Sequence, residues 1–320
     1  MKHSILIAAI GLAALAPAQQ SKSGAPGEPF EVVRVRPNIY MIASLAGNVT
    51  VQLGNNPGHD GVLLVNTGPA QLTARIMAEI RKLSDKPIRF ILNTSADAHH
   101  TGGNAAFANS ASKGTDVVRA QDGAAAVFAQ DNVLLRMSAP EAKAPQEGWP
   151  TITFDDMKAF PFNGESIQMF AEPHAHTDGD SIVHFRGSNV VATGDVFRTT
   201  GYPVIDLQRG GSVQGELKAL NHILDITVPD IMQEGGTLVI PGQGRLCDEA
   251  DVTEYRDMMT ILRDRVADLL KKGKTLAEVK QARVSRDYDN RYSTPSWTGD
   301  MLVEAIYKSL SQDKSAEAKK

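Results

Sequence analysis

Two short apolar segments with an amphipathic segment between them constrain the fold of this chain most strongly. Residues 61–68 (GVLLVNTG) and 87–93 (PIRFILN) are almost uniformly apolar in their centres, which predicts buried strands. Residues 71–85 between them predict a helix whose apolar face comprises Leu72, Ile76, Ile80 and Leu83. A buried strand, a helix and a second buried strand in this order indicate a layered α/β fold.

Strands and helices remain interleaved beyond this unit. Residues 151–173 predict a β-rich region with a hairpin turn at Phe162-Asn163-Gly164. Residues 114–131 predict a short strand followed by a helix, and residues 215–227 predict a further helix.

The domain organisation follows from the absence of a linker between the strand-rich halves. We expect one domain over residues 30–247. Residues 248–320 have a helical period with breaks near 272–274 and 287–297, so we expect a C-terminal helical extension packed on the domain.

The N-terminus predicts export. Residues 1–18 contain Lys2, a short apolar run and Ala16-Pro17-Ala18, which is typical of a cleaved signal peptide. An uncleaved membrane anchor is the alternative, although the run is shorter than a bilayer requires. Residues 19–29 are small and polar and predict a flexible tether. We therefore expect a periplasmic or secreted protein without membrane contact after removal of the signal.

Charge and cysteine content exclude some functions. The 320-residue chain has a net charge of −4, which gives no reason to expect a nucleic-acid partner. Cys247 is the only cysteine, so no intramolecular disulfide can form. A small-molecule substrate or ligand is the expected partner, and the sequence does not predict an oligomeric state.

Polar side chains gather in loops that follow predicted strands. The candidates are Asp97, His99, His100, His176, Asp195 and Gln243. Imidazole and carboxylate ligands together suit Zn²⁺, with Fe or Mn²⁺ as alternatives. The carboxyl ends of strands are also where layered α/β folds place their ligand sites.

These segments resemble the motifs of the metallo-β-lactamase superfamily. Residues 93–104 (NTSADAHHTGGN) align without a gap to the family pattern Asn-Thr-His-x-His-x-Asp-His-x-Gly-Gly-Asn. Residues 175–185 (AHTDGDSIVHF), 190–197 (VVATGDVF) and 239–244 (VIPGQG) are similar to the later motifs. The resemblance implies a four-layer αββα sandwich, and places His176 at a metal-ligand position and Asp195 at the position that bridges two metals.

The aligned motifs also depart from the family pattern. Ser95 and Asp97 stand where the family has His, His99 where it has Asp, and Gln243 where it has His. Asn66 also stands where the family usually has a supporting Asp. The resemblance therefore does not imply two-zinc hydrolysis for this chain.

A single metal ion is still compatible with these residues. His99, His100 and Asp195 could bind one ion, with Gln243 as a weak fourth ligand. Asp97 and His176 could supply a poorer second site or join the first. One ion is thus favoured over two, and a site without metal is the remaining alternative.

Two functions follow from these alternatives. The first is an exported hydrolase in which metal-activated water attacks an ester, amide or similar bond and Asp97 acts as the general base. We expect Arg198, Tyr202 and Arg209 to line its pocket. The second is a catalytically degenerate, metal-free member that binds a small molecule.

Overall fold

The computed structural model describes residues 30–54, 60–109 and 124–317. The predicted signal peptide and tether lie outside these residues. Within the described part of the chain, no helix has the length and apolar character needed to cross a membrane.

The first sheet follows the order of the sequence. Its strands are β1 (Glu31–Arg36), β2 (Ile39–Ser44), β3 (Gly47–Leu53), β4 (Val62–Val65), β5 (Ile88–Leu92), β6 (Ala126–Gln130) and β7 (Ile152–Phe154). Strands β1 to β4 pair antiparallel, whereas β4 to β7 pair parallel. Helix α1 (Thr73–Leu83) connects β4 to β5, as the opening pattern of the sequence predicts.

The second sheet has the order β12-β11-β10-β9-β8. Its strands are β8 (Met157–Phe162), β9 (Glu165–Ala171), β10 (Ser181–Phe185), β11 (Val190–Ala192) and β12 (Leu238–Ile240). The β8–β9 turn contains Asn163 and Gly164, both with positive φ, in agreement with the hairpin expected there.

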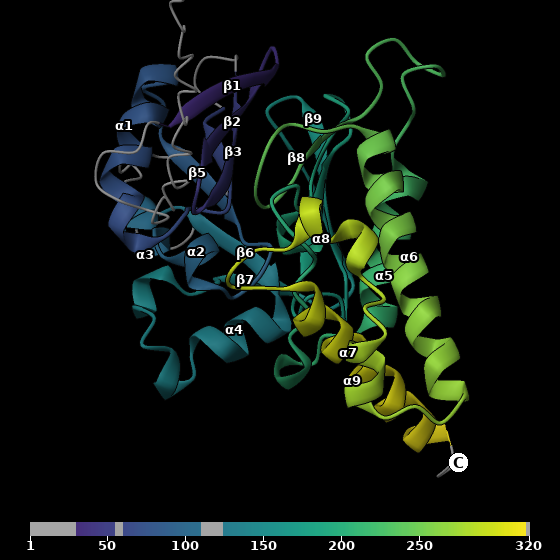
Figure 1. Ribbon diagram of the computed structural model, residues 1–320. Helices are drawn as coiled ribbons and strands as arrows, with labels where there is room; N and C mark the ends of the chain where they lie inside the picture. Colours follow the sequence, from purple (N-terminus) through teal and green to yellow (C-terminus); the bar gives the residue numbers. More distant parts are fainter. Residues whose placement is uncertain (1–29, 55–59, 110–123, 318–320) are drawn as a thin grey trace, which may run out of the picture.

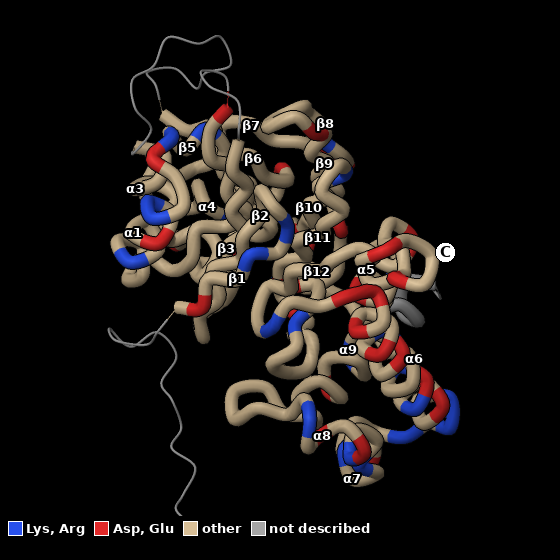
Figure 2. The backbone as a smooth tube through the Cα atoms, turned by 90° about the horizontal axis from the view of Figure 1, so that it is seen from above, with Lys and Arg blue, Asp and Glu red and all other residues tan. Residues whose placement is uncertain are grey.

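The two sheets face each other across an apolar core. Met41 and Leu63 from the first sheet pack with Met169 and Val183 from the second, and all four are buried. Ile76 of α1 and Phe107 of α3 (Asn104–Asn109) cover the outer face of the first sheet. Figures 1 and 2 show the resulting layers, with α1 and α3 on one side and α5, α6 and α9 on the other. The expected αββα sandwich is confirmed.

The outer face of the second sheet is covered by the later helices. They are α5 (Val213–Ile226), α6 (Glu249–Lys271), α7 (Leu276–Gln281), α8 (Arg286–Tyr292) and α9 (Gly299–Glu317). Leu220, Met259 and Ile306 from α5, α6 and α9 pack with Ile182 and Val239 of the sheet. The predicted C-terminal helical region is therefore present and shares this core.

Two local expectations were wrong. The apolar run at residues 126–130 was expected in a helix but forms β6, because it pairs with β5 and β7 inside the first sheet. The helix of that region, α4 (Asp131–Met137), begins directly after this strand. The short strand expected at the start of residues 114–131 lies outside the described residues. In addition, α8 occupies part of the break expected at residues 287–297.

Candidate metal centre

The candidate ligands converge at one end of the sandwich. His99 and His100 follow β5, His176 follows β9, and Asp195 follows β11. Ligand atoms of His99, His100 and Asp195, here called the first cluster, lie within 4.8 Å of one another. The same holds for Asp97, His176 and Asp195, here called the second cluster. Asp195 belongs to both.

The loop that carries the histidines, residues 93–104, is built around a very short helix. The Ser95 hydroxyl accepts a hydrogen bond from the Asp97 amide at 3.2 Å, which turns the chain into α2 (Ala98–Thr101). This bend overcomes the tendency of adjacent side chains to point apart. The rings of His99 and His100 lie with their centroids 4.1 Å apart, and both reach Asp195.

Buried polar contacts fix the position of this histidine loop. Asn66 accepts a hydrogen bond from the Thr94 amide at 3.0 Å and has a positive φ of 63°. The amide of Thr67 donates to the His100 carbonyl at 2.8 Å. Gly194 also has positive φ, and a Cβ there would lie 2.4 Å from Thr94 Oγ1. The loop therefore packs directly against the residue that precedes Asp195.

The first cluster has short distances between its ligand atoms. His100 Nε2 lies 2.9 Å and His99 Nε2 lies 3.1 Å from Asp195 Oδ2. Asp195 and His100 are buried, whereas the His99 side chain is 36% exposed. This gives the cluster one face toward solvent.

The second cluster is held by hydrogen bonds on both sides. His176 Nε2 lies 2.9 Å from Asp97 Oδ2 and 3.9 Å from Asp195 Oδ2. The other ring nitrogen, Nδ1, donates to the Val204 carbonyl at 2.6 Å. A carbonyl acceptor on Nδ1 leaves Nε2 as the atom that faces the carboxylates.

Two arginines contact the two site carboxylates. Arg198 Nη2 donates to Asp195 Oδ1 at 3.0 Å. Arg209 donates from both terminal nitrogens to Asp97 and from Nε to Asp206 at 2.6 Å. Both arginines were expected to line the pocket, and the structure places them beside the candidate ligands.

The protonation states follow from burial and these partners. Burial lowers the pKa of His100, so its imidazole is neutral. Burial also acts to lower the pKa of His176, but the hydrogen bond to Asp97 and the nearby charges of Asp195 and Asp180 outweigh it and raise that pKa to about 10. Burial raises the pKa of Asp97, yet the hydrogen bonds from His176 and Arg209 outweigh burial and hold this pKa below its ordinary value. The second cluster is thus an ion-paired network.

The ligand geometry favours a metal at the first cluster. Zinc bonds of about 2.0–2.2 Å hold neighbouring ligand atoms a little over 3 Å apart, close to the His–Asp distances in this cluster. The chemistry of His100 and Asp195 also fits, because a neutral imidazole and an ionised carboxylate are the forms that bind a metal. Burial acts to lower the pKa of His99, but its contacts with Asp195 outweigh burial and raise that pKa, so a metal would have to displace a proton there. His100 Nδ1 is buried and, among the described groups, has no hydrogen-bond partner, so the usual support for a metal-binding histidine is missing.

The second cluster fits a metal less well. Asp97 accepts hydrogen bonds from Arg209 and His176, and these contacts occupy both of its oxygens. A cation there would have to displace the Arg209 guanidinium or lie beside it.

Two other candidate residues have hydrogen-bond partners outside the clusters. The Gln243 amide donates to the Leu45 carbonyl and its oxygen accepts from the Thr200 hydroxyl, each at 2.9 Å. Tyr202 is 1% exposed, and its hydroxyl donates to Asp289 of α8 at 2.9 Å. The structure thus places Tyr202 in the core beneath the C-terminal helices rather than in a pocket wall.

One acidic residue near the site is not among those predicted from the sequence. Glu216 lies in the first turn of α5, fully buried, and neither carboxyl oxygen has a hydrogen-bond partner among the described groups. Burial raises the pKa of Glu216 well above its ordinary value, so the group is protonated. The sequence did contain a sign of this buried acid, because Glu216 lies on the same face of the helix as the apolar residues Val213, Leu220 and Ile223.

Sequence comparison defines the class of protein. A family model described as the metallo-beta-lactamase superfamily matches residues 45–254. The chain belongs to this superfamily, as its motifs indicated. No curated protein sequence matches the chain.

Solved structures with the same fold have low sequence identity. The stereoselective inverting sec-alkylsulfatase Pisa1 from Pseudomonas sp. is 14% identical with a TM-score of 0.64. That match covers 87% of this chain and 50% of the sulfatase, so the chain spans half of the sulfatase's length. A metallo-beta-lactamase from Pontibacter korlensis is 14% identical with a TM-score of 0.56, over 72% of this chain and 99% of that protein. At these identities the likeness establishes the fold alone.

Proposed function

We propose that the protein is an exported hydrolase that binds one divalent metal ion at His99, His100 and Asp195. The observation that carries the proposal is the convergence of two imidazole nitrogens on one buried carboxylate oxygen, at 2.9 and 3.1 Å. Zn²⁺ is the favoured ion because nitrogen and oxygen ligands at this spacing suit it, with Fe or Mn²⁺ as alternatives. Membership of a superfamily of metallohydrolases supports the reaction class.

The metal would supply the chemistry that these side chains lack. A bound Zn²⁺ lowers the pKa of a coordinated water and polarises the bond to be broken, whether an ester, an amide or a similar bond. The protein fixes the positions of the ligand side chains. The backbone of His100 is held by a hydrogen bond from the Thr67 amide to the His100 carbonyl, and the Asp195 carboxylate is oriented by Arg198 at 3.0 Å. The 36% exposed side chain of His99 leaves this face accessible to a substrate.

Arg198 and Arg209 support one ion in preference to two. Each guanidinium already neutralises one of the two site carboxylates. A second divalent cation beside them would add repulsion between like charges without adding an anionic ligand.

The proposed role for Asp97 is general base. Its carboxylate is ionised and lies in the second cluster, next to the proposed metal position. The ion pair with Arg209 makes it a weaker base than a free carboxylate, because a lowered pKa reduces the drive to accept a proton. Movement of Arg209 away from Asp97 would make this carboxylate a stronger base.

Metal dependence of hydrolysis tests the proposal. The chelator-treated protein and the protein resupplied with Zn²⁺, Fe²⁺ or Mn²⁺ would be assayed with 4-nitrophenyl acetate, sulfate and phosphate. We expect at least one substrate to be hydrolysed only with metal, and His100→Ala to lower that rate about 100-fold or more. His184→Ala, in β10 outside both clusters, is the matched control. Hydrolysis that is indifferent to chelation would contradict a metal-dependent reaction.

The alternative function is a metal-free protein that binds a small molecule. The observation in its favour is that the guanidinium groups of Arg198 and Arg209 balance the charges of Asp195 and Asp97. Thermal unfolding separates the two functions, because a ligand that binds only the folded state raises the melting temperature. Stabilisation by metal ions would support the hydrolase, and no response to them would support the binding protein.

A further inference from the structure

A cavity lies beside the histidine loop. Its volume is about 960 Å³, within the range that small-molecule sites occupy. Ala96 and Ala98, which flank Asp97, form part of its wall, and so does Arg209. A ligand bound in this cavity would therefore contact residues next to the Asp97–Arg209 ion pair.

The wall is mainly apolar but carries three cations. The apolar part includes Ala70, Ala96, Leu135, Met137, Ala144 and Pro145. The cations are Arg136, Lys143 and Arg209, and the acids that also line the cavity are Glu141 and Asp178. Arg136 donates to Asp178 at 2.6 Å, which neutralises this pair.

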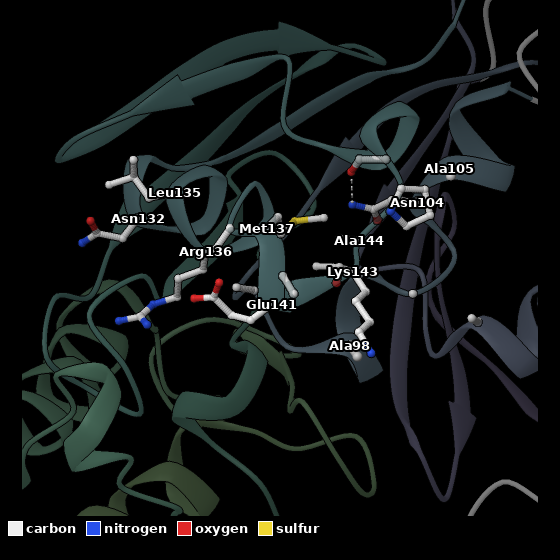
Figure 3. Close-up of a pocket in the computed structure, with 18 of the residues that line it drawn as sticks. Ala98, Asn104, Ala105, Asn132, Leu135, Arg136, Met137, Glu141, Lys143 and Ala144 are labelled. Carbon is white, nitrogen blue, oxygen red and sulfur yellow. Dashed lines mark hydrogen bonds between the residues drawn. The ribbon is translucent and has the colours of Figure 1, made fainter.

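Lys143 differs from the two arginines of the wall. In the described part of the chain, its ammonium group has no ion pair or hydrogen bond. Figure 3 shows the Lys143 side chain extending toward Ala98, while the Glu141 carboxylate is directed toward Arg136. The backbone of Lys143 also adopts the left-handed conformation, with φ of 52°, which is uncommon for this residue type and often marks functional positions.

We propose that this cavity binds the substrate, and that the substrate is an organic anion whose charged group contacts Lys143 while its apolar body lies along the alanine-rich wall. A carboxylate, a sulfate ester and a phosphate ester share this chemistry. The proposal rests on the proposed function only in naming the ligand a substrate, since binding itself needs no metal.

Arg209 connects the cavity with the site. Its guanidinium bridges Asp97 and Asp206, it is 30% exposed, and it lines both this cavity and a second one of about 570 Å³ that also contains His176. Arg209 is thus the contact between the wall of this cavity and Asp97.

Calorimetric titration with matched probes tests the proposal. Hexanoate, hexyl sulfate and hexyl phosphate would be titrated into chelator-treated and zinc-loaded protein at fixed ionic strength, with 1-hexanol as the neutral match. We expect at least one anion to bind about tenfold tighter than hexanol, which corresponds to about 1.4 kcal/mol. The anion that binds best identifies the charged group.

Substitutions locate the binding. Lys143→Gln is expected to lower the affinity for the preferred anion at least about fivefold, because a hydrogen bond to a charged group is lost. Lys143→Arg keeps the positive charge and is expected to bind the anion like the unaltered protein. Lys272→Gln, which removes the same charge from an exposed lysine paired with Asp268, is the control and is expected to have no effect.

Two results would overturn the inference. One is equal binding of the anions and hexanol to the unaltered protein, and the other is equal binding to Lys143→Gln and Lys272→Gln. The outcome is separable from that of the proposed function. Anion binding that depends on Lys143, without metal or hydrolysis, would leave this inference standing and the hydrolase proposal wrong.

Discussion

At the scale of single residues, the resemblance to the family motif predicts that Asp97 and Ser95 stand at histidine positions. In the structure, Asp97 forms an ion pair with Arg209. Ser95 accepts a hydrogen bond from the Asp97 amide and helps to turn the histidine loop. Both side chains therefore make contacts within the protein that order this loop.

Asp97→Ala tests the role of this carboxylate. We expect the metal-dependent hydrolysis rate to fall about 100-fold, because a positioned general base contributes roughly 10²–10⁴. Steady-state rates with the best 4-nitrophenyl substrate measure the effect, with His184→Ala, outside both clusters, as the control. A rate for Asp97→Ala equal to that of the unaltered protein would rule out the base assignment.

Part of the site could be predicted from residue types alone. The order of the loops and the residues His100, His176 and Asp195 predicted that these side chains lie close together, and the structure brings them into the two clusters. The ion pairs of Arg198 and Arg209 could not be predicted, since they depend on side-chain directions in loops far apart in the sequence. Arg198 lies only three residues after Asp195, but spacing alone does not show that the two side chains meet.

At the scale of elements, the site depends on how closely the loops after β5 and β11 approach each other. Gly194 permits this approach, because its positive φ suits glycine and a Cβ would collide with the Thr94 side chain at 2.4 Å. The contact of Gly194 with Thr94 and the first cluster show that these loops lie at the same end of the sandwich.

Gly194→Ala is expected to destabilise the fold by about 2–4 kcal/mol, from the left-handed backbone together with the collision. Gly164→Ala is the matched control, because Gly164 also has positive φ, but a Cβ added there would meet no described atom within 4 Å beyond its chain neighbours. We expect the control substitution to lower the free energy of unfolding by about 1–2 kcal/mol. Urea unfolding measures both variants. Equal losses of unfolding free energy in the two variants would mean that the collision with Thr94 does not contribute to the destabilisation.

The elements themselves were predictable to different degrees. The β4–α1–β5 unit could be predicted from the spacing of its apolar residues. The hairpin could be predicted from Asn163-Gly164, a residue pair that is typical of tight turns. Strand β6 was not predictable, because AAAVFAQD is short and apolar, and periodicity cannot separate a buried strand from a buried helix in such a run.

At the scale of the whole molecule, the C-terminal helices support the segment that leads to the site. The Tyr255 hydroxyl of α6 donates to the Gly201 carbonyl at 3.0 Å, and the Trp297 indole donates to the Pro203 carbonyl at 3.0 Å. These contacts hold residues 201–205, which run directly to Asp206 and Arg209. The extension is thus part of the structure that positions Arg209. The helical period of residues 248–320 predicted the helices but not these contacts.

The metal content of the purified protein tests the central claim most directly. After dialysis against Zn²⁺, Fe²⁺ or Mn²⁺ and removal of free metal, elemental analysis is expected to find about one equivalent of one of these ions per chain. Asp195→Asn is expected to lose it, and His176→Ala is expected to retain it, because His176 belongs only to the second cluster. Metal well below one equivalent with every ion, or an equal loss in His176→Ala, would contradict a single ion held by His99, His100 and Asp195.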